Sequence, residues 1–383
     1  MASRPRLKPY FRPLRRGPDA VQLGLSAASG GVVLSGLDRA EVAFIARLDG
    51  TLTEADLVRG ATTHGVDPQR AAALVALLRD HHLLDRDLDD GGPDRVDLAR
   101  ARGAQVAAGS LHPGDGSTRA PVDAWPPPAK PAAARVRSMP GERAHGASTT
   151  DRLLTRAGRR VVVAGAGRMP WAIGNLLRES GIGRVDLGRA ALDALDQALR
   201  SDPGGPVPDL VVLVGDGVVD ASAGEPWRRR RVPTLPVVME ARRVVVGPLI
   251  DDQWGPCLHC LDLERADRDV VWPALVAQVH RGPTDPSTDP DGDSTLTAMA
   301  SGVVGMVVHS HLSGEGPPPG ISIEVSLPWP RLDHRRWPRH PACAAHPAAP
   351  RTDTGSPPAR WTRGSAAAPA SGSVAAAIGV GGE

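Results

Sequence analysis

Apolar periodicity in this chain is interrupted over one long stretch, and this interruption limits the fold to two separate ordered segments. The stretch from Asp87 to Thr150 is rich in Gly, Pro, Asp and Arg and has no repeating apolar pattern. Such a segment buries too little apolar surface to offset the entropy lost on ordering. We therefore predict a small module over residues 1–88, a disordered linker over 89–157, an α/β domain over 158–346 and a disordered tail over 347–383.

The first segment has the pattern of two short strands followed by three helices. β-Type patterns over Ala20–Leu25 and Gly31–Leu34 predict two strands joined by a turn of small residues. Apolar residues at helical spacing, with Asp or Thr in capping positions, predict helices over Asp38–Leu48, Thr53–His64 and Asp67–Leu84. This combination is typical of a winged-helix-like module.

The second segment has the pattern of a Rossmann-like α/β domain with a mostly parallel sheet. A β-branched run over Arg160–Gly165 leads through the glycine turn Gly165–Gly167 to a helix over Trp171–Ser180 and a strand ending at Leu187. Strand, glycine turn, helix and strand form one βαβ unit of a parallel sheet. Further strands are predicted over Asp209–Val214, Leu235–Met239, Val244–Ile250 and Ile321–Leu327, and further helices over Ala274–His280 and Ser294–Ser313.

All three cysteines of the chain have metal-knuckle spacing. Cys257 and Cys260 form a CxxC pair, and Cys343 begins the distant sequence Cys-Ala-Ala-His. Thiolates at this spacing can bind one tetrahedral ion, and a second pair from a distant segment completes a structural zinc site. The fourth ligand is one of three histidines, of which the first has the best spacing: His346, His340 and His259. Two other interpretations are buried cysteines without a metal, and a catalytic metal with an open position.

Charge and composition exclude several classes of function. The 45 basic and 43 acidic residues nearly cancel, so no excess field draws the chain to nucleic acid or to an anionic membrane. The two lysines, Lys8 and Lys130, do not follow a glycine, which excludes a Walker-type phosphate loop. No run of about eighteen uncharged apolar residues occurs, so we expect a cytoplasmic protein. A DNA-binding regulator is a further alternative because several arginines lie near the N-terminus: Arg4, Arg6, Arg12, Arg15 and Arg16.

A set of motifs resembles the ThiF-type adenylating fold of ubiquitin-activating-like enzymes. The motifs are Arg160–Gly167, Asp209–Val214, Val246–Ile250, Cys257–Cys260 and the late Cys343. A longer phrase, Cys-Leu-His-Cys-Leu-Asp-Leu-Glu-Arg-Ala-Asp-Arg-Asp, is followed by Trp-Pro and later by Trp-Pro-Arg-His-Pro-Ala-Cys. It resembles the actinobacterial branch linked to thiazole/oxazole-modified peptides (TOMM), described as leader-peptide-binding or cyclodehydratase-partner proteins. The similarity covers about residues 4–88 and 158–346.

This resemblance implies a scaffold protein that binds the leader peptide of a ribosomally made, bacteriocin-type precursor (a RiPP). It further implies a separate modifying enzyme as a partner, and a homodimer. The N-terminal module is similar to PqqD-like recognition elements, which bind the leader peptide as an added strand on a sheet edge. On this sequence the candidate peptide-binding edge is Val21, Leu23 and Leu25.

The ATP site that the resemblance implies is only partly present. Gly165 and Gly167 match the glycine loop, and Asp216 lies where the family has its magnesium-binding aspartate. Pro170 replaces the third glycine, Arg189 occupies the ribose-binding position, and the domain has no lysine. We therefore predict a degenerate adenylating domain without catalytic residues. The alternative is an ATP-dependent adenylyltransferase or cyclodehydratase component that holds Mg-ATP on the two glycines and the aspartate.

Overall fold

The structure is a computed structural model, and it describes a subset of the chain. The described residues are 3–8, 11–25, 31–85, 154–240, 242–251, 255–281, 294–327 and 329–346. Most of the predicted linker (89–157) and the whole predicted tail (347–383) lie outside these ranges. The predicted domain boundaries therefore stay predictions.

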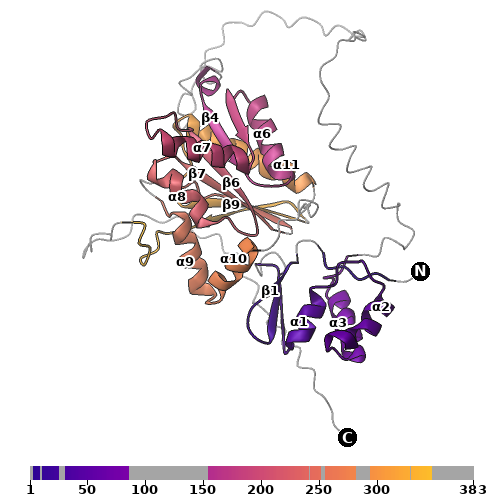
Figure 1. Ribbon diagram of the computed structural model, residues 1–383. Helices are drawn as coiled ribbons and strands as arrows, with labels where there is room; N and C mark the ends of the chain where they lie inside the picture. Colours follow the sequence, from indigo (N-terminus) through magenta and orange to yellow (C-terminus); the bar gives the residue numbers. More distant parts are fainter. Residues whose placement is uncertain are drawn as a thin grey trace, which may run out of the picture.

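The N-terminal part contains a small antiparallel sheet packed against short helices (Figure 1). The sheet has the order β1-β2-β3, with strands at Pro13–Arg15, Ala20–Leu23 and Val32–Ser35. The helices are α1 (Arg39–Ile45), α2 (Glu54–Gly60), a 3-10 turn (Ala61–His64) and α3 (Pro68–Asp80). The predicted strands and helices are present, while β1 is an additional strand. The winged-helix arrangement stays a prediction.

Local capping explains where these helices begin. Asp38 precedes α1, and its side chain accepts a hydrogen bond from the Glu41 amide at 2.7 Å. The Glu41 side chain in turn accepts one from the Asp38 amide at 2.7 Å, which completes a capping box. Thr53 and Asp67 cap α2 and α3 in a similar way. The sequence therefore sets these helix starts through contacts within one turn.

The larger sheet has seven strands in the order β10-β9-β8-β7-β6-β4-β5. Strands β5, β4, β6 and β7 run parallel, and β8, β9 and β10 continue the sheet as antiparallel neighbours. Their bounds are β4 Arg160–Ala164, β5 Arg184–Leu187, β6 Leu210–Asp216, β7 Thr234–Glu240, β8 Arg243–Val246, β9 Ile321–Ser326 and β10 Arg331–Arg336. The predicted α/β class is confirmed. Strand β10 was missed because its sequence, Arg-Leu-Asp-His-Arg-Arg, has one apolar residue.

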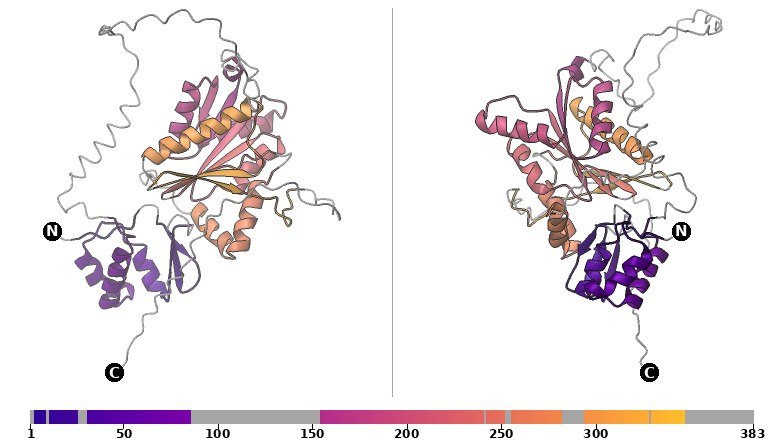
Figure 2. Two further views of the ribbon diagram at one scale, coloured as in Figure 1. Left: turned by 180° about the vertical axis from the view of Figure 1, so that it is seen from behind. Right: turned by 45° about the vertical axis from the view of Figure 1, so that its right-hand side comes forward.

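Helices cover both faces of this sheet (Figures 1 and 2). On one face, α6 (Arg168–Glu179) and α11 (Ser294–Leu312) form a core with the strands. On the other face, α7 (Arg189–Ser201), α8 (Ala221–Arg229) and α9 (Leu258–Arg268) form a second core that includes Cys257, Cys260 and Cys343. Helix α10 (Trp272–Arg281) follows α9 and lies beside the N-terminal sheet.

Helix α11 is long and apolar enough to cross a membrane by length and composition. Half of its apolar window is nevertheless buried inside the protein. Val304 and Val308 have no exposed surface and belong to the core with α6 and the sheet. A buried core helix passes the same composition test, so this helix is weak evidence for a membrane.

We expect that Ile173→Ala destabilises the α/β domain by about 2–5 kcal/mol, because it leaves a cavity in a packed core. Ile173 on α6 has no exposed surface. The control is Trp171→Ala on the same helix, where the side chain is 62% exposed and should change stability by less than about 0.5 kcal/mol. Urea unfolding followed by circular dichroism measures both. Equal losses in the two variants would show that α6 is not packed as described.

Candidate functional site

The four predicted metal ligands lie together. One donor atom from each of Cys257, Cys260, Cys343 and His346 lies within 4.8 Å of the other three. The Cys257 sulfur is 3.7 Å from that of Cys260 and 3.6 Å from that of Cys343. Four ligands on a tetrahedral ion with metal–sulfur bonds of about 2.3 Å place their sulfurs about 3.8 Å apart. The donors therefore fit one tetrahedral metal ion.

Two separate segments supply these ligands. Cys257 is the N-cap of α9 and Cys260 lies in its first turn, so one helical turn brings both sulfurs to one side. Cys343 and His346 follow β10 in a short turn, in which the His346 amide donates to the Cys343 carbonyl at 3.3 Å. The Arg339 side chain fastens this segment to the knuckle, because its Nε donates to the Gly255 carbonyl at 2.9 Å.

The other two candidate histidines are placed differently. His259 is exposed on α9, between the two cysteines in sequence but outside the cluster. The ring of His340 lies 2.9 Å from the Asp267 carboxylate through Nε2, and its Nδ1 accepts a bond from the Ala342 amide at 3.2 Å. Both ring nitrogens of His340 are therefore engaged. His346 is the histidine that the structure brings to the sulfurs.

Burial of the cysteines favours a metal over free thiolates. Cys257, Cys260 and Cys343 are 2%, 0% and 6% exposed. Without an ion, burial and the neighbouring sulfurs raise the pKa of Cys257 to about 12. A bound cation removes this penalty because it stabilises the thiolate form. The same three sulfurs are therefore either neutral thiols or the ligands of a cation.

Next to the cysteines on α9, an arginine side chain lies between two tryptophan rings. The Arg265 guanidinium on α9 lies 5.2 Å from the ring centroid of Trp272 and 5.2 Å from that of Trp337. It also pairs with the Asp262 carboxylate at 3.4 Å. Burial lowers the pKa of Arg265, opposed by that carboxylate. One cation thus joins α9, α10 and the segment that carries Cys343.

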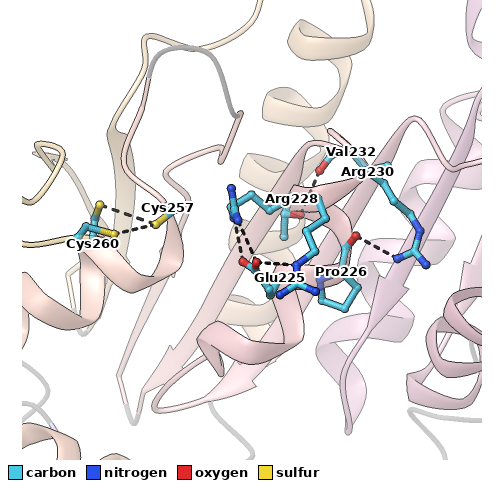
Figure 3. A network of polar contacts seen from close by, with 10 residues as sticks. Glu225, Pro226, Arg228, Arg230, Val232, Cys257 and Cys260 are labelled. Carbon is cyan, nitrogen blue, oxygen red and sulfur yellow. Dashed lines mark hydrogen bonds and ion pairs between the residues drawn. The ribbon is translucent and has the colours of Figure 1, made fainter. Parts of the chain in front are cut away.

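Helix α8 packs against the start of α9. Figure 3 shows the polar contacts of Glu225 on α8 together with Cys257 and Cys260. A Cβ at Gly224 would lie 2.5 Å from the end of the Leu258 side chain, so the two helices are in close contact at this glycine. The next residue, Glu225, accepts bonds from Arg228 at 2.8 and 2.9 Å. The Arg228 guanidinium, with Arg229, lowers the pKa of Glu225 to about 2. Arg229 also pairs with Glu225, and the following Arg230 pairs with Asp196, each at 2.9 Å.

A groove of about 790 Å³ lies beside the cluster, between α8, α9, α10 and residues 342–345. Its walls are mainly apolar, with Leu263, Trp272 and Val276 among them. Cys343 also lines it, so the metal-binding segment forms one wall.

The three candidate nucleotide ligands lie at one edge of the large sheet. Gly165 and Gly167 follow β4, and Asp216 ends β6, its parallel neighbour. A Cβ at Gly165 would lie 2.7 Å from the Val214 Cβ, so packing between these strands requires glycine there. Gly167 has φ +85° and caps α6 without a side-chain hydrogen bond. Packing and backbone conformation therefore explain both glycines of the turn without a bound nucleotide.

Among the described residues, the end of β5 offers no free carboxylate for a ribose. Strand β5 ends at Leu187 and continues into Gly188 and Arg189, which begins α7. The carboxylate of Asp186 accepts from Arg160 at 2.8 Å and from Arg184 at 3.2 Å. These guanidiniums outweigh burial and lower the pKa of Asp186. Its carboxylate is thus committed to two arginines.

Residues of the N-terminal part reach the same edge, a placement that sequence reasoning missed. A Cβ at Gly217 would lie 2.6 Å from the Leu25 side chain, so Leu25 contacts the loop after Asp216. The surrounding protein raises the pKa of Asp216, and the Arg12 guanidinium acts against this rise. No local pattern signals these contacts, since about two hundred residues separate the partners.

The predicted peptide-binding edge needs correction. Val21 and Leu23 lie on β2, which is the central strand and pairs with β1 and β3. Both side chains are 0% exposed in the N-terminal core. Leu25 follows β2 and contacts Gly217 instead. A central strand has no free backbone groups for a peptide, so β2 cannot be the edge.

The two outer strands of this sheet differ in their surroundings. The edge of β1 is occupied: Gln278 of α10 donates to the Arg15 carbonyl at 2.7 Å and accepts from the Arg15 amide at 2.7 Å. Arg16 next to it binds Asp269 through two bonds of 2.6 and 2.8 Å. Strand β3 pairs with β2 and, within the described ranges, with no second strand. Its Val33 is 42% exposed.

Comparisons with known proteins give low similarity. No protein-family model and no curated protein matches the chain in sequence. Similar solved structures include the heterocyclase TruD (17% identity, TM-score 0.34, 90% of this chain and 42% of that chain). Others are a heterocyclase in complex with substrate and cofactor (15%, 0.34, 89% and 39%) and MccB of E. coli (12%, 0.39, 89% and 96%). The chain thus spans less than half the length of the two heterocyclases. Likeness at this level does not assign an activity.

We expect the purified protein to contain one tightly bound metal ion per chain, and Cys260→Ser to lose most of it. A buried thiolate is a stronger ligand than a hydroxyl. The matched control is His259→Ala, one residue away and exposed, which should keep the metal. Elemental analysis by mass spectrometry measures the content. Equal metal content in the wild-type protein and Cys260→Ser would contradict this site.

Proposed function

We propose that this protein is a cytoplasmic leader-peptide-binding scaffold for the modification of ribosomally made peptides. The observation that carries the proposal is the contrast between the two edges of the N-terminal sheet. Gln278 occupies the backbone of β1, while β3 presents an unpaired edge among the described residues. An extended peptide can add to such an edge through backbone hydrogen bonds.

The exposed residues of β3 suit this role, whereas two of the α3 leucines belong to the core. Leu74 and Leu78 of α3 are 2% and 0% exposed, so they belong to the core, while Leu77 packs at its margin. Val33 and Ser35 of β3 are exposed. An added strand would rest its alternate side chains against this exposed surface. The resemblance to PqqD-like elements points to a leader peptide as that strand.

The adenylating site is degenerate in this proposal. A nucleotide needs phosphate ligands, a ribose ligand and a cation site at the same edge. Here Pro170 is buried in the first turn of α6, and Arg189 stands after β5 where a carboxylate would bind ribose. The chain would therefore keep the frame of an adenylating domain and act beside a separate modifying enzyme.

The metal is zinc with a structural role in this proposal. Three thiolates and one imidazole form a closed donor set that Zn²⁺ favours, with no position left for water. Cys257, Cys260, Cys343 and His346 would hold the ion and fasten the C-terminal segment to α9. This arrangement supports stability rather than hydrolysis.

A second candidate function is an ATP-dependent adenylyltransferase or cyclodehydratase component. The observation in its favour is that Gly165, Gly167 and Asp216 lie at the carboxyl edge of adjacent parallel strands. Ligands of α/β sheets bind at this edge. Mg-ATP would need these residues because the other expected ligands are replaced.

We expect a gene for a small Cys/Ser/Thr-rich precursor beside the gene of this protein, and we expect the leader segment of that precursor to bind with micromolar affinity. The tests are Val32→Pro and Val33→Pro in β3. In an antiparallel ladder, successive amides point alternately to the neighbour and to the open edge, so one of these variants leaves the ladder to β2 intact. That variant should keep the wild-type circular dichroism and bind at least about tenfold more weakly, a loss of about 1.4 kcal/mol. Unchanged affinity by calorimetry would reject the β3 edge.

We expect Mg-ATP to bind no more tightly than about 1 mM, since the edge lacks a ribose carboxylate and a lysine. Isothermal titration calorimetry with the wild-type protein and Gly167→Asp should give the same weak heats. Micromolar binding that Gly167→Asp and Asp216→Asn abolish would favour the adenylyltransferase instead.

A further inference from the structure

Strand β10 forms the open edge of the seven-stranded sheet. It pairs with β9 along its whole length, from Arg331 opposite Ser326 to Arg336 opposite Ile321. Within the described ranges it has no other strand neighbour. Five of its six residues are exposed, which leaves both of its faces largely uncovered. Unpaired amides and carbonyls along such an edge are a template for another strand.

The charge on β10 is unbalanced. The strand carries Arg331, Arg335 and Arg336 and one carboxylate, Asp333, which pairs with Arg331 at 3.2 Å. In the part of the chain that the structure describes, Arg335 and Arg336 have no carboxylate partner. Arg243 of the nearby strand β8 is different, because Glu240 and Glu324 bind it at 3.0 and 2.8 Å. The positive charge therefore collects at the open edge.

Arg335 is held in a fixed position. Its guanidinium lies 3.8 Å from the ring centroid of Trp337, a cation–π contact. Its Nη2 is buried and makes no hydrogen bond with any described residue. A guanidinium held in this way loses little conformational entropy when a carboxylate binds it.

Apolar side chains accompany these arginines. Trp329, just before β10, is 80% exposed, and Leu332 is 50% exposed. Leu332 stands opposite Val325 of β9, which is fully buried in the core, so the core face of the sheet continues onto an uncovered strand. Large exposed apolar groups beside an open edge favour a docking surface.

A second copy of this chain is a poor occupant, because its β10 strand brings the same excess of three arginines over one carboxylate. In a centred antiparallel pairing of two β10 strands, Arg331 would stand opposite Arg336 of the other copy, and Leu332 opposite Arg335. Like charges directly across a ladder are destabilising. Carboxylates at those cross-strand positions would instead pair with the arginines.

We propose that β10 docks an extended acidic segment of a partner protein, which adds to the large sheet as an eighth strand. Carboxylates of the segment would stand opposite Arg331 and Arg335, which share one face of the strand, and an apolar residue would stand opposite Leu332 on the other face. This surface goes beyond the proposed leader-peptide edge at β3 and depends neither on it nor on the metal.

The test uses a short acetylated peptide of alternating Glu and Val. A peptide of alternating Lys and Val is the control. Hydrogen exchange on the full chain should show new protection at residues 331–336 with the Glu/Val peptide and none with the Lys/Val peptide. Calorimetry should give at least tenfold weaker binding for Arg331→Glu combined with Arg335→Glu, since both arginines share the face that meets the glutamates. The matched control, Arg184→Glu on the opposite edge strand β5, should bind as the wild-type protein does; Arg184 is also exposed.

Several results would overturn the proposal. The β10 charges would have no role if neither peptide bound or if both peptides bound equally. The same holds if Arg184→Glu lost as much affinity as the β10 variant. Protection confined to residues 32–35 would place the peptide on β3. Displacement of the peptide by random duplex DNA would identify a general polyanion surface. A wild-type dimer that Leu332→Asp converts to a monomer would identify β10 as an interface between copies.

Discussion

The joint between α9 and the segment after β10 is the interaction on which the positions of α9, α10 and the N-terminal sheet depend. Cys257 and Cys260 approach Cys343 and His346 on one side of this joint. On the other, Arg265 lies between Trp272 and Trp337. Both contacts join α9 to the chain that returns from β10, and the second includes α10. Because α10 also carries Gln278, the position of the N-terminal sheet follows from the same joint.

The docking of α10 on β1 decides which surface the N-terminal part can offer. A glutamine side chain has an NH2 group that donates and a carbonyl oxygen that accepts, so it can satisfy the backbone of one edge residue as a neighbouring strand would. With Arg15 satisfied in this way, β3 is left as the open side. The same docking brings Arg12 and Leu25 to the loop after β6. The proposed peptide edge and the proposed remnant of a nucleotide site thus belong to one continuous assembly.

Features set by residues close together in the sequence could be predicted, and features set by contacts between distant segments could not. The CxxC pair was predictable because Cys257 and Cys260 share one helical turn, and Cys-Ala-Ala-His because its two ligands share one tight turn. Strand β2 was also predictable from its pattern, but its place in the centre was not. That place depends on β1, a strand of three residues with one buried side chain. Strand β10 could not be predicted from the sequence, because it has no buried face and so no alternation of apolar and polar residues.

By itself, the sequence determined the α/β class, the glycine turn after β4, the starts of the three N-terminal helices and the three cysteines of the candidate metal site. These features depend on periodicity, capping and spacing, which act within a few residues. Only the tertiary structure decided that His346 rather than His340 joins the sulfurs, that β3 rather than β2 is open, and that the arginines of β10 lack carboxylates. Each of these outcomes is set by packing between segments far apart in the chain, where local pattern carries no information about which surfaces meet.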